Sequence, residues 1–264
     1  MPGLLTRGVL VGDVRITLRD PRGQQPDREI EGVQKIHRIG GNIAMGFAGN
    51  IDTALWMIGD AARNVAHGMP EGAMLNQPSR FLVHWTRRLR WVWSNHLTER
   101  QQAGGVALLW MGALPTRHEL GLGATMAWIV RSPAFVPERV ENRTARSIGS
   151  GANVEEYAAE LYEIEQDFPN LVQFEAHPWS PTGGIAFALA VSISSVLERH
   201  AAAGVSPHLV ICSVRWGEVA FFTNDRTGFG PEAPTLVMPP IAATWEEWQT
   251  FKHKHGLANT LALG

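Results

Sequence analysis

The sequence predicts a fold of the α+β class, in which strands and helices follow one another in groups. Short apolar runs of β-type composition are bounded by glycine and proline, and other segments carry apolar residues at helical spacing. The chain has 264 residues, of which 45% are hydrophobic, so it can bury one substantial core. We expect the order strands, two helices, strands, two helices and strands.

The first strands are expected close to the start of the sequence. Gly8–Asp13 and Val14–Leu18 have β-type composition. The stretch Arg19–Glu29 is polar and contains proline, which predicts a loop before the next strand.

A second strand pair and a helix are expected next. Val33–Ile39 and Asn42–Phe47 flank Gly40-Gly41, which would suit a two-residue hairpin turn with positive φ. Asn50 precedes a segment with apolar residues at helical spacing and can accept a hydrogen bond from the first turn. We therefore expect a helix over Ile51–Ala66.

A long second helix is predicted over Gln77–Gln102. Its expected apolar face holds Phe81, Trp85, Leu89, Val92 and Trp93. Its arginines lie mostly elsewhere, and we interpret them as a solvated face, with an intersubunit surface as the alternative.

The remaining elements follow the same rules. Strands are expected at Val106–Gly112, Ala124–Val130, Arg146–Ser150, His208–Val214 and Glu218–Thr223, and helices at Val154–Glu165 and near Gly184–Arg199. Beyond Pro231, the aromatic residues Trp245, Trp248 and Phe251 stand at helical spacing. This extension is expected either to contact a neighbouring subunit or to cover its own sheet.

Composition excludes several classes of function. The formal charge of −2 gives no electrostatic basis for binding nucleic acid or an anionic membrane. The one cysteine, Cys212, lies in an apolar run, so we expect a buried structural thiol and a reducing compartment. No histidine, cysteine and carboxylate set has metal-site spacing and no phosphate loop is present, so no cofactor is expected. With no leader or membrane span apparent, we expect a cytoplasmic protein.

The stretch Val33–Asn50 carries the most informative motif. It has Lys35 in its first strand and Gly-Phe-Ala-Gly at 46–49, directly before the expected helix. This succession resembles the catalytic core of the proteasome β subunit and its bacterial HslV-type relatives, and the likeness extends from about Gly8 to Asp225. The resemblance implies a four-layer α-β-β-α sandwich of two antiparallel sheets over residues 1–230, with residues 231–264 as an extension. It is the fold of N-terminal-nucleophile hydrolases.

The resemblance also implies a threonine-type peptidase and assigns roles to four residues. Asp13 would pair with Lys35, whose ammonium would orient the threonine and favour its deprotonation. The Gly46 amide would stabilise the oxyanion, and Ser150 would lie near the threonine's amine. Each has a structural alternative: a turn aspartate, a lysine at a strand edge, a glycine serving backbone geometry and a turn serine.

The sequence also departs from the family pattern. Thr6 is the only threonine upstream of Asp13, and it stands too close to Asp13 for the strand that should carry the nucleophile. We therefore expect that first strand to be mostly missing. Further along, His200 and Ala203 stand where the family has an aspartate and a serine.

Two readings of function follow. In the first, the chain is a subunit of a self-compartmentalising threonine peptidase that forms rings and receives protein substrates from an ATPase unfoldase, and the given 264 residues are inactive. In the second, it is a catalytically silent structural or regulatory ring subunit. A non-peptidase amide hydrolase of the same superfamily is a further alternative, because fold does not fix substrate.

Overall fold

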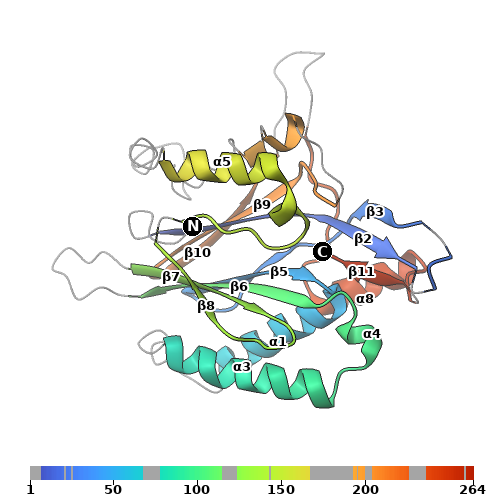
Figure 1. The fold of residues 1–264 in the computed structure, drawn as a ribbon, viewed down its shortest axis with the longest axis horizontal. Helices are drawn as coiled ribbons and strands as arrows, with labels where there is room; N and C mark the ends of the chain where they lie inside the picture. Colours follow the sequence, from blue (N-terminus) through green and yellow to red (C-terminus); the bar gives the residue numbers. More distant parts are fainter. Residues whose placement is uncertain are drawn as a thin grey trace.

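The computed structural model describes residues 7–20, 22–24, 26–67, 78–114, 124–142, 144–166, 193–194, 196–199, 204–225, 236–258 and 260–264. These residues form a mixed fold of helices and antiparallel sheets, which confirms the α+β class (Figure 1). The paired strands of the described residues are all antiparallel.

Three sheets are present in the described residues. The first has the order β1 (Gly8–Asp13), β9 (Leu209–Arg215), β10 (Glu218–Thr223). The second has the order β4 (Ile36–Arg38), β5 (Ile43–Gly49), β6 (Val106–Leu114), β7 (Ala124–Arg131), β8 (Glu138–Val140). The third has the order β11 (Leu261–Leu263), β2 (Arg15–Arg19), β3 (Arg28–Glu31).

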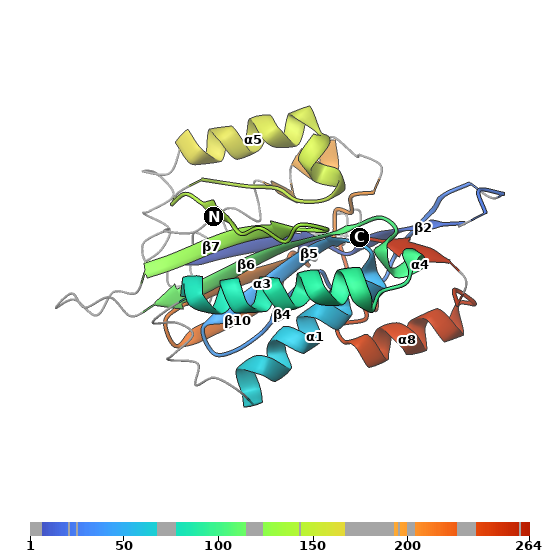
Figure 2. The same ribbon diagram turned by 60° about the horizontal axis from the view of Figure 1, so that its bottom comes forward.

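Helices lie on both sides of the first two sheets. In the views of Figures 1 and 2, α5 (Glu155–Gln166) lies on one side, and α1 (Ile51–His67) and α3 (Pro78–Asn95) lie on the other. Successive side chains of a strand point to opposite faces, so Met45 joins the cluster with α1 and α3, whereas Ala44 joins a cluster with residues of β1 and β9. A third cluster holds residues of β1, β9 and α5.

The start of α1 confirms the predicted cap. The Thr53 N–H donates to Asn50 Oδ1 at 3.1 Å. By contrast, the single helix predicted over Gln77–Gln102 is wrong, because α3 ends at Asn95 and a short helix α4 (Glu99–Gln102) follows. Thr98 caps α4 with an extended backbone (φ −70°, ψ 160°), and that conformation interrupts the helix.

Two further predictions are wrong. Neither Gly40 nor Gly41 has a positive φ. The Ile43 carbonyl accepts hydrogen bonds from the N–H groups of both Ile39 (2.9 Å) and Gly40 (3.2 Å), so the connection between the strands is longer than a two-residue turn. Arg146–Ser150 is not a strand: it is irregular and leads into a 3₁₀ turn at Ser150–Asn153. Most of the helix expected near Gly184–Arg199 lies outside the described residues.

The extension belongs to the core of its own chain. The predicted helix is present as α8 (Trp245–Lys254), and Trp248 is fully buried in the cluster that contains α1. Asp52, in the first turn of α1, accepts hydrogen bonds from Trp248 Nε1 at 3.0 Å and Lys252 Nζ at 2.6 Å. Of the two placements left open by the sequence, the described residues show the second.

Candidate active site

One cavity brings together the four residues singled out from the sequence. Asp13 at the end of β1, Lys35 before β4, Gly46 in β5 and Ser150 at the start of the 3₁₀ turn all line a cavity of about 210 Å³. Most of its other lining residues are apolar. Residues from four separate segments therefore converge at one place, as the resemblance implies, and their chemical roles stay predictions.

A buried ion pair forms the polar end of this cavity. Lys35 Nζ lies 3.1 Å from Asp13 Oδ1 and 3.0 Å from Asp13 Oδ2, and the side chains are only 8% and 17% exposed. A lysine buried to this degree is costly without a partner, so the carboxylate keeps the ammonium in place. Asp13 is itself oriented by the Arg15 N–H, which donates to Oδ1 at 2.8 Å.

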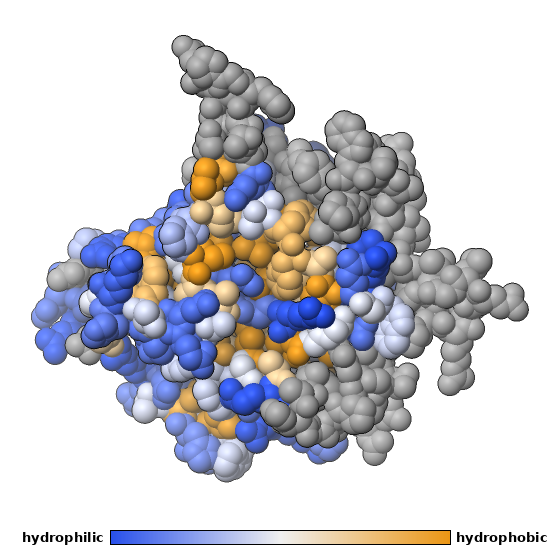
Figure 3. All heavy atoms as spheres, turned by 180° about the vertical axis from the view of Figure 1, so that it is seen from behind, coloured by the Kyte–Doolittle hydropathy of each residue, from blue (hydrophilic) through white to orange (hydrophobic). Residues whose placement is uncertain are grey.

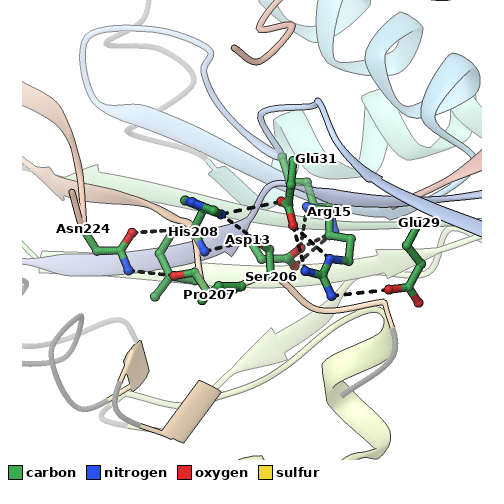
Figure 4. A network of polar contacts seen from close by, with 10 residues as sticks. Asp13, Arg15, Glu29, Glu31, Ser206, Pro207, His208 and Asn224 are labelled. Atoms are coloured by element: carbon green, nitrogen blue, oxygen red, sulfur yellow. Dashed lines mark hydrogen bonds and ion pairs between the residues drawn. The ribbon is translucent and has the colours of Figure 1, made fainter. Parts of the chain in front are cut away.

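A charged network holds the strand that follows Asp13 (Figure 4). Arg15 donates to Glu31 Oε1 from Nε at 3.0 Å and from Nη2 at 2.8 Å, and from Nη1 to Glu29 Oε2 at 3.3 Å. Glu29 Oε1 also accepts from the Gly204 N–H at 2.7 Å. These contacts tie β2, β3 and the segment before β9 together beside the cavity.

The Ser206 and His208 pair in the same network is structural. Ser206 Oγ lies 3.2 Å from His208 Nδ1, and Glu31 Oε2 lies 4.0 Å from the same nitrogen. In a Ser-His-acid triad the serine and the acid contact different ring nitrogens of the histidine, whereas here both lie nearest to Nδ1. Ser206 is fully buried and accepts from the His208 N–H at 3.0 Å, so it shapes the turn before β9.

The two glycines of the Gly-Phe-Ala-Gly motif occupy different positions in β5. Gly46 is within β5, an inner strand of its sheet, opposite Ile36 of β4 and Leu109 of β6. Gly49 ends β5, with φ +96°, and its N–H donates at 2.7 Å to the main-chain oxygen of Gly264, which lines the cavity. Of the two, Gly46 is the one that lines the cavity, and the Gly49 amide is taken up by Gly264.

Ser150 lies where two loops meet. Gly149, the residue before it, has φ +85°, a backbone conformation that favours glycine. In the second loop, a Cβ on Gly204 would lie only 2.8 Å from Ser150 Oγ, so the close approach of the two loops needs glycine there. Three other residues considered from the sequence, Thr6, His200 and Ala203, lie outside the described residues.

Comparison with known proteins finds no family model that matches the chain and no characterised protein significantly similar to it. Within the ranges that the structure describes, no helix is long and apolar enough to cross a membrane. The same ranges contain no group of three or more histidine, cysteine, aspartate or glutamate side chains arranged to hold a metal ion.

Two buried titratable groups flank the site without entering it. Cys212 of β9 is buried as predicted, and burial raises the pKa of its thiol to about 12, which makes it unreactive at neutral pH. His37 of β4 stacks on the cavity residue Phe47 with ring centroids 5.8 Å apart. Burial lowers the pKa of His37 to about 4, although backbone groups of Gln34 and Ala243 act in the opposite direction.

The low pKa of His37 predicts acid sensitivity. An unfolded histidine titrates near 6.5, so between pH 6.5 and 4 the unfolded chain binds the extra proton. The free energy of unfolding is therefore at its full value above pH 6.5, and the titration of His37 lowers it by about 3 kcal/mol as the pH drops to 4. Urea unfolding at a series of pH values should show this loss, and His37→Gln should remove it. Equal pH dependence in both proteins would contradict the prediction.

Proposed function

We propose that this chain is a proteasome β-like or HslV-like subunit whose cavity is an amide-hydrolysing site of the threonine-peptidase kind. The observation that carries the proposal is the buried Lys35–Asp13 ion pair, which places an ammonium group at the wall of a mostly apolar cavity. The three buried clusters, one between the sheets and one under the helices on each side, support the four-layer α-β-β-α arrangement.

The proposed chemistry uses the groups at the polar end of the cavity. The Lys35 ammonium favours the deprotonated form of a nearby nucleophile, and Asp13 fixes its position. In the role that the resemblance assigns, the Gly46 amide stabilises the oxyanion of a tetrahedral intermediate. In the described part of the chain the aliphatic hydroxyl side chains that line the cavity are Ser147 and Ser150, with no threonine among them. The proposed threonine nucleophile would therefore come from outside the described residues, and we expect the 264-residue form to be inactive.

The test starts with the protein purified from its own host. Its first residue is read by N-terminal sequencing and intact mass, and its turnover of a fluorogenic peptide is measured. In a form that begins with threonine, we expect Lys35→Ala to lower kcat/KM by at least about 100-fold, because the group that activates the nucleophile is lost. A covalent peptide β-lactone should then acylate that threonine, as peptide mapping would show.

Lys252→Ala is the matched control for Lys35→Ala. Lys252 is also a mostly buried lysine paired with an aspartate, Asp52, but it lies away from the cavity. Its loss should reduce stability and leave kcat/KM nearly unchanged. Turnover by the form that begins at Met1 or Pro2, abolished by Lys35→Ala, would overturn the expected inactivity. Turnover insensitive to Lys35→Ala would overturn the proposed site.

A second candidate function is that of a catalytically silent ring subunit. The observation that favours it is the position of Gly264, which occupies space beside Lys35. Both candidates include self-association into rings, and the first also includes an ATPase unfoldase that delivers protein substrates. Trp91, 57% exposed on the outer helix α3, supports such a contact surface, since in the resembling family this helix pair lies between stacked rings.

A further inference from the structure

The strand β11 leads directly into the candidate active site. It pairs with β2 through Leu263 opposite Thr17, and the residue after it, Gly264, lines the same cavity as Lys35, Asp13 and Ser150. A Cβ on Gly264 would lie 3.3 Å from Lys35 Cε, so this residue approaches the ammonium-bearing side chain closely. A segment of the chain's own extension thus forms part of the cavity wall beside the ion pair.

Main-chain groups hold this segment along both of its edges. On one edge it follows β2, and on the other Leu263 forms an antiparallel bridge with Asn50. At its end the Gly49 N–H donates to the Gly264 oxygen at 2.7 Å, and the Gly264 N–H donates to the Gly49 oxygen at 2.9 Å. Main-chain pairing with a strand is one way in which proteins bind an extended peptide, and pockets for its side chains then set the specificity.

The surroundings of the segment's side chains limit which residue sizes fit at each position. Ala262 is buried in the main core cluster, and Leu263 packs so closely on Gly104 that a Cβ there would lie 2.3 Å from Leu263 Cδ2. Gly264 is surrounded by Lys35, Phe47 and Ile51 at distances that leave little room for a side chain. The groove therefore fits a small residue, then leucine, then glycine.

We propose that residues Leu261–Gly264 are a displaceable intramolecular inhibitor: they occupy a groove between β2 and Gly49-Asn50 that otherwise binds an extended peptide of the same pattern. The proposal rests on the proposed function in taking the Lys35 cavity as the reacting centre. Displacement of this short segment opens the approach to Lys35. Binding of a peptide to the groove needs no catalysis, so it can be measured independently of hydrolysis.

Two other surfaces of the protein do not support a proposal. Apolar side chains cross the middle of the face opposite to that of Figure 1, but nothing in the structure shows what covers them (Figure 3). A second hollow, lined by Arg22, Arg28 and Arg100 among others, lies beside the extension and holds no group that points to a ligand.

The test uses a fluorescein-labelled synthetic peptide with the sequence of residues 260–264 and reads its binding by fluorescence anisotropy. A variant that ends at Thr260 should bind this peptide at least about tenfold more tightly than the full chain, because the tethered segment competes at high effective concentration. Leu263→Asp, which weakens the packing on Gly104 without shortening the chain, should bind it better as well. Val237→Asp, an exposed change in the same extension, should behave like the full chain.

A peptide methylated on its backbone nitrogens tests the pairing itself and should not bind. Equal affinity of the shortened and full chains, or no binding to a shortened chain that keeps its circular dichroism and unfolding midpoint, would overturn the proposal. If the shortened chain does not fold, Leu263→Asp decides, and if both fail to fold, β11 is a structural strand and the proposal is wrong. In a form that begins with threonine, peptide binding without any hydrolysis would count against the proposed peptidase and leave this inference standing.

Discussion

Gly49→Ala should destabilise the protein by at least about 3 kcal/mol, because two costs act at this one position. Gly49 has φ +96°, in the region that side chains disfavour, and a Cβ there would lie 2.4 Å from the carbonyl oxygen of Gly105. That oxygen accepts the Asn50 N–H at 2.8 Å, so it cannot move away without loosening the start of α1. The free energy of unfolding in urea measures the loss.

Gly217→Ala separates the two costs at Gly49. Gly217 has a similar φ of +80°, but a Cβ there would meet nothing within 4 Å. Its substitution should therefore cost only about 1 kcal/mol of backbone strain. Equal losses in the two variants would show that the close approach to Gly105 does not contribute, and the tight junction between β5 and α1 would then be in doubt.

Trp248→Ala should cost about 4 kcal/mol, since it empties a fully buried site in the largest core cluster. The substitution also removes the 3.0 Å hydrogen bond from Trp248 Nε1 to Asp52. Asp52 keeps the 2.6 Å contact with Lys252 Nζ, so its carboxylate is not left without a partner. Chemical denaturation followed by circular dichroism would measure the change.

Trp245→Ala is the control on the same helix. Its ring is 37% exposed, and Lys252 Nζ lies 5.7 Å from the centroids of both tryptophans, so either change removes one such contact. Because Trp245 is partly exposed whereas Trp248 is fully buried, we expect a loss smaller than that of Trp248→Ala by at least about 1 kcal/mol. Comparable losses at both positions would mean that α8 does not anchor the extension through Trp248.

Local pattern was enough to predict the long elements of the fold. The strands β1 and β9 were found from apolar runs, and the Asn50 cap from its place before a helical repeat, because these signals lie within a few residues. The break between α3 and α4 was missed although its signal, Thr98 followed three residues later by Gln101, is present. The apolar repeat continues past Thr98, and that longer pattern predicts one unbroken helix.

Features set by distant contacts could not be predicted in this way. The strand β11 has only three residues, and its place depends on β2 and on Gly49 at the far end of the sequence. For the same reason the paired hydrogen bonds between Gly49 and Gly264 could not be predicted from local pattern. The meeting of Asp13 with Lys35 came from the resemblance, because no local rule joins a strand end to a later lysine.

The antiparallel pairing of β11 with β2 also has a consequence for how the chain is made. A ribosome adds roughly 5–20 residues per second, so β2 leaves it on the order of ten seconds before β11 is synthesised. During that interval the nascent chain exposes one edge of the β2–β3 hairpin and the approach to Lys35. An exposed edge of this kind pairs readily with other chains. The nascent chain is therefore open to pairing of this kind until β11 is translated.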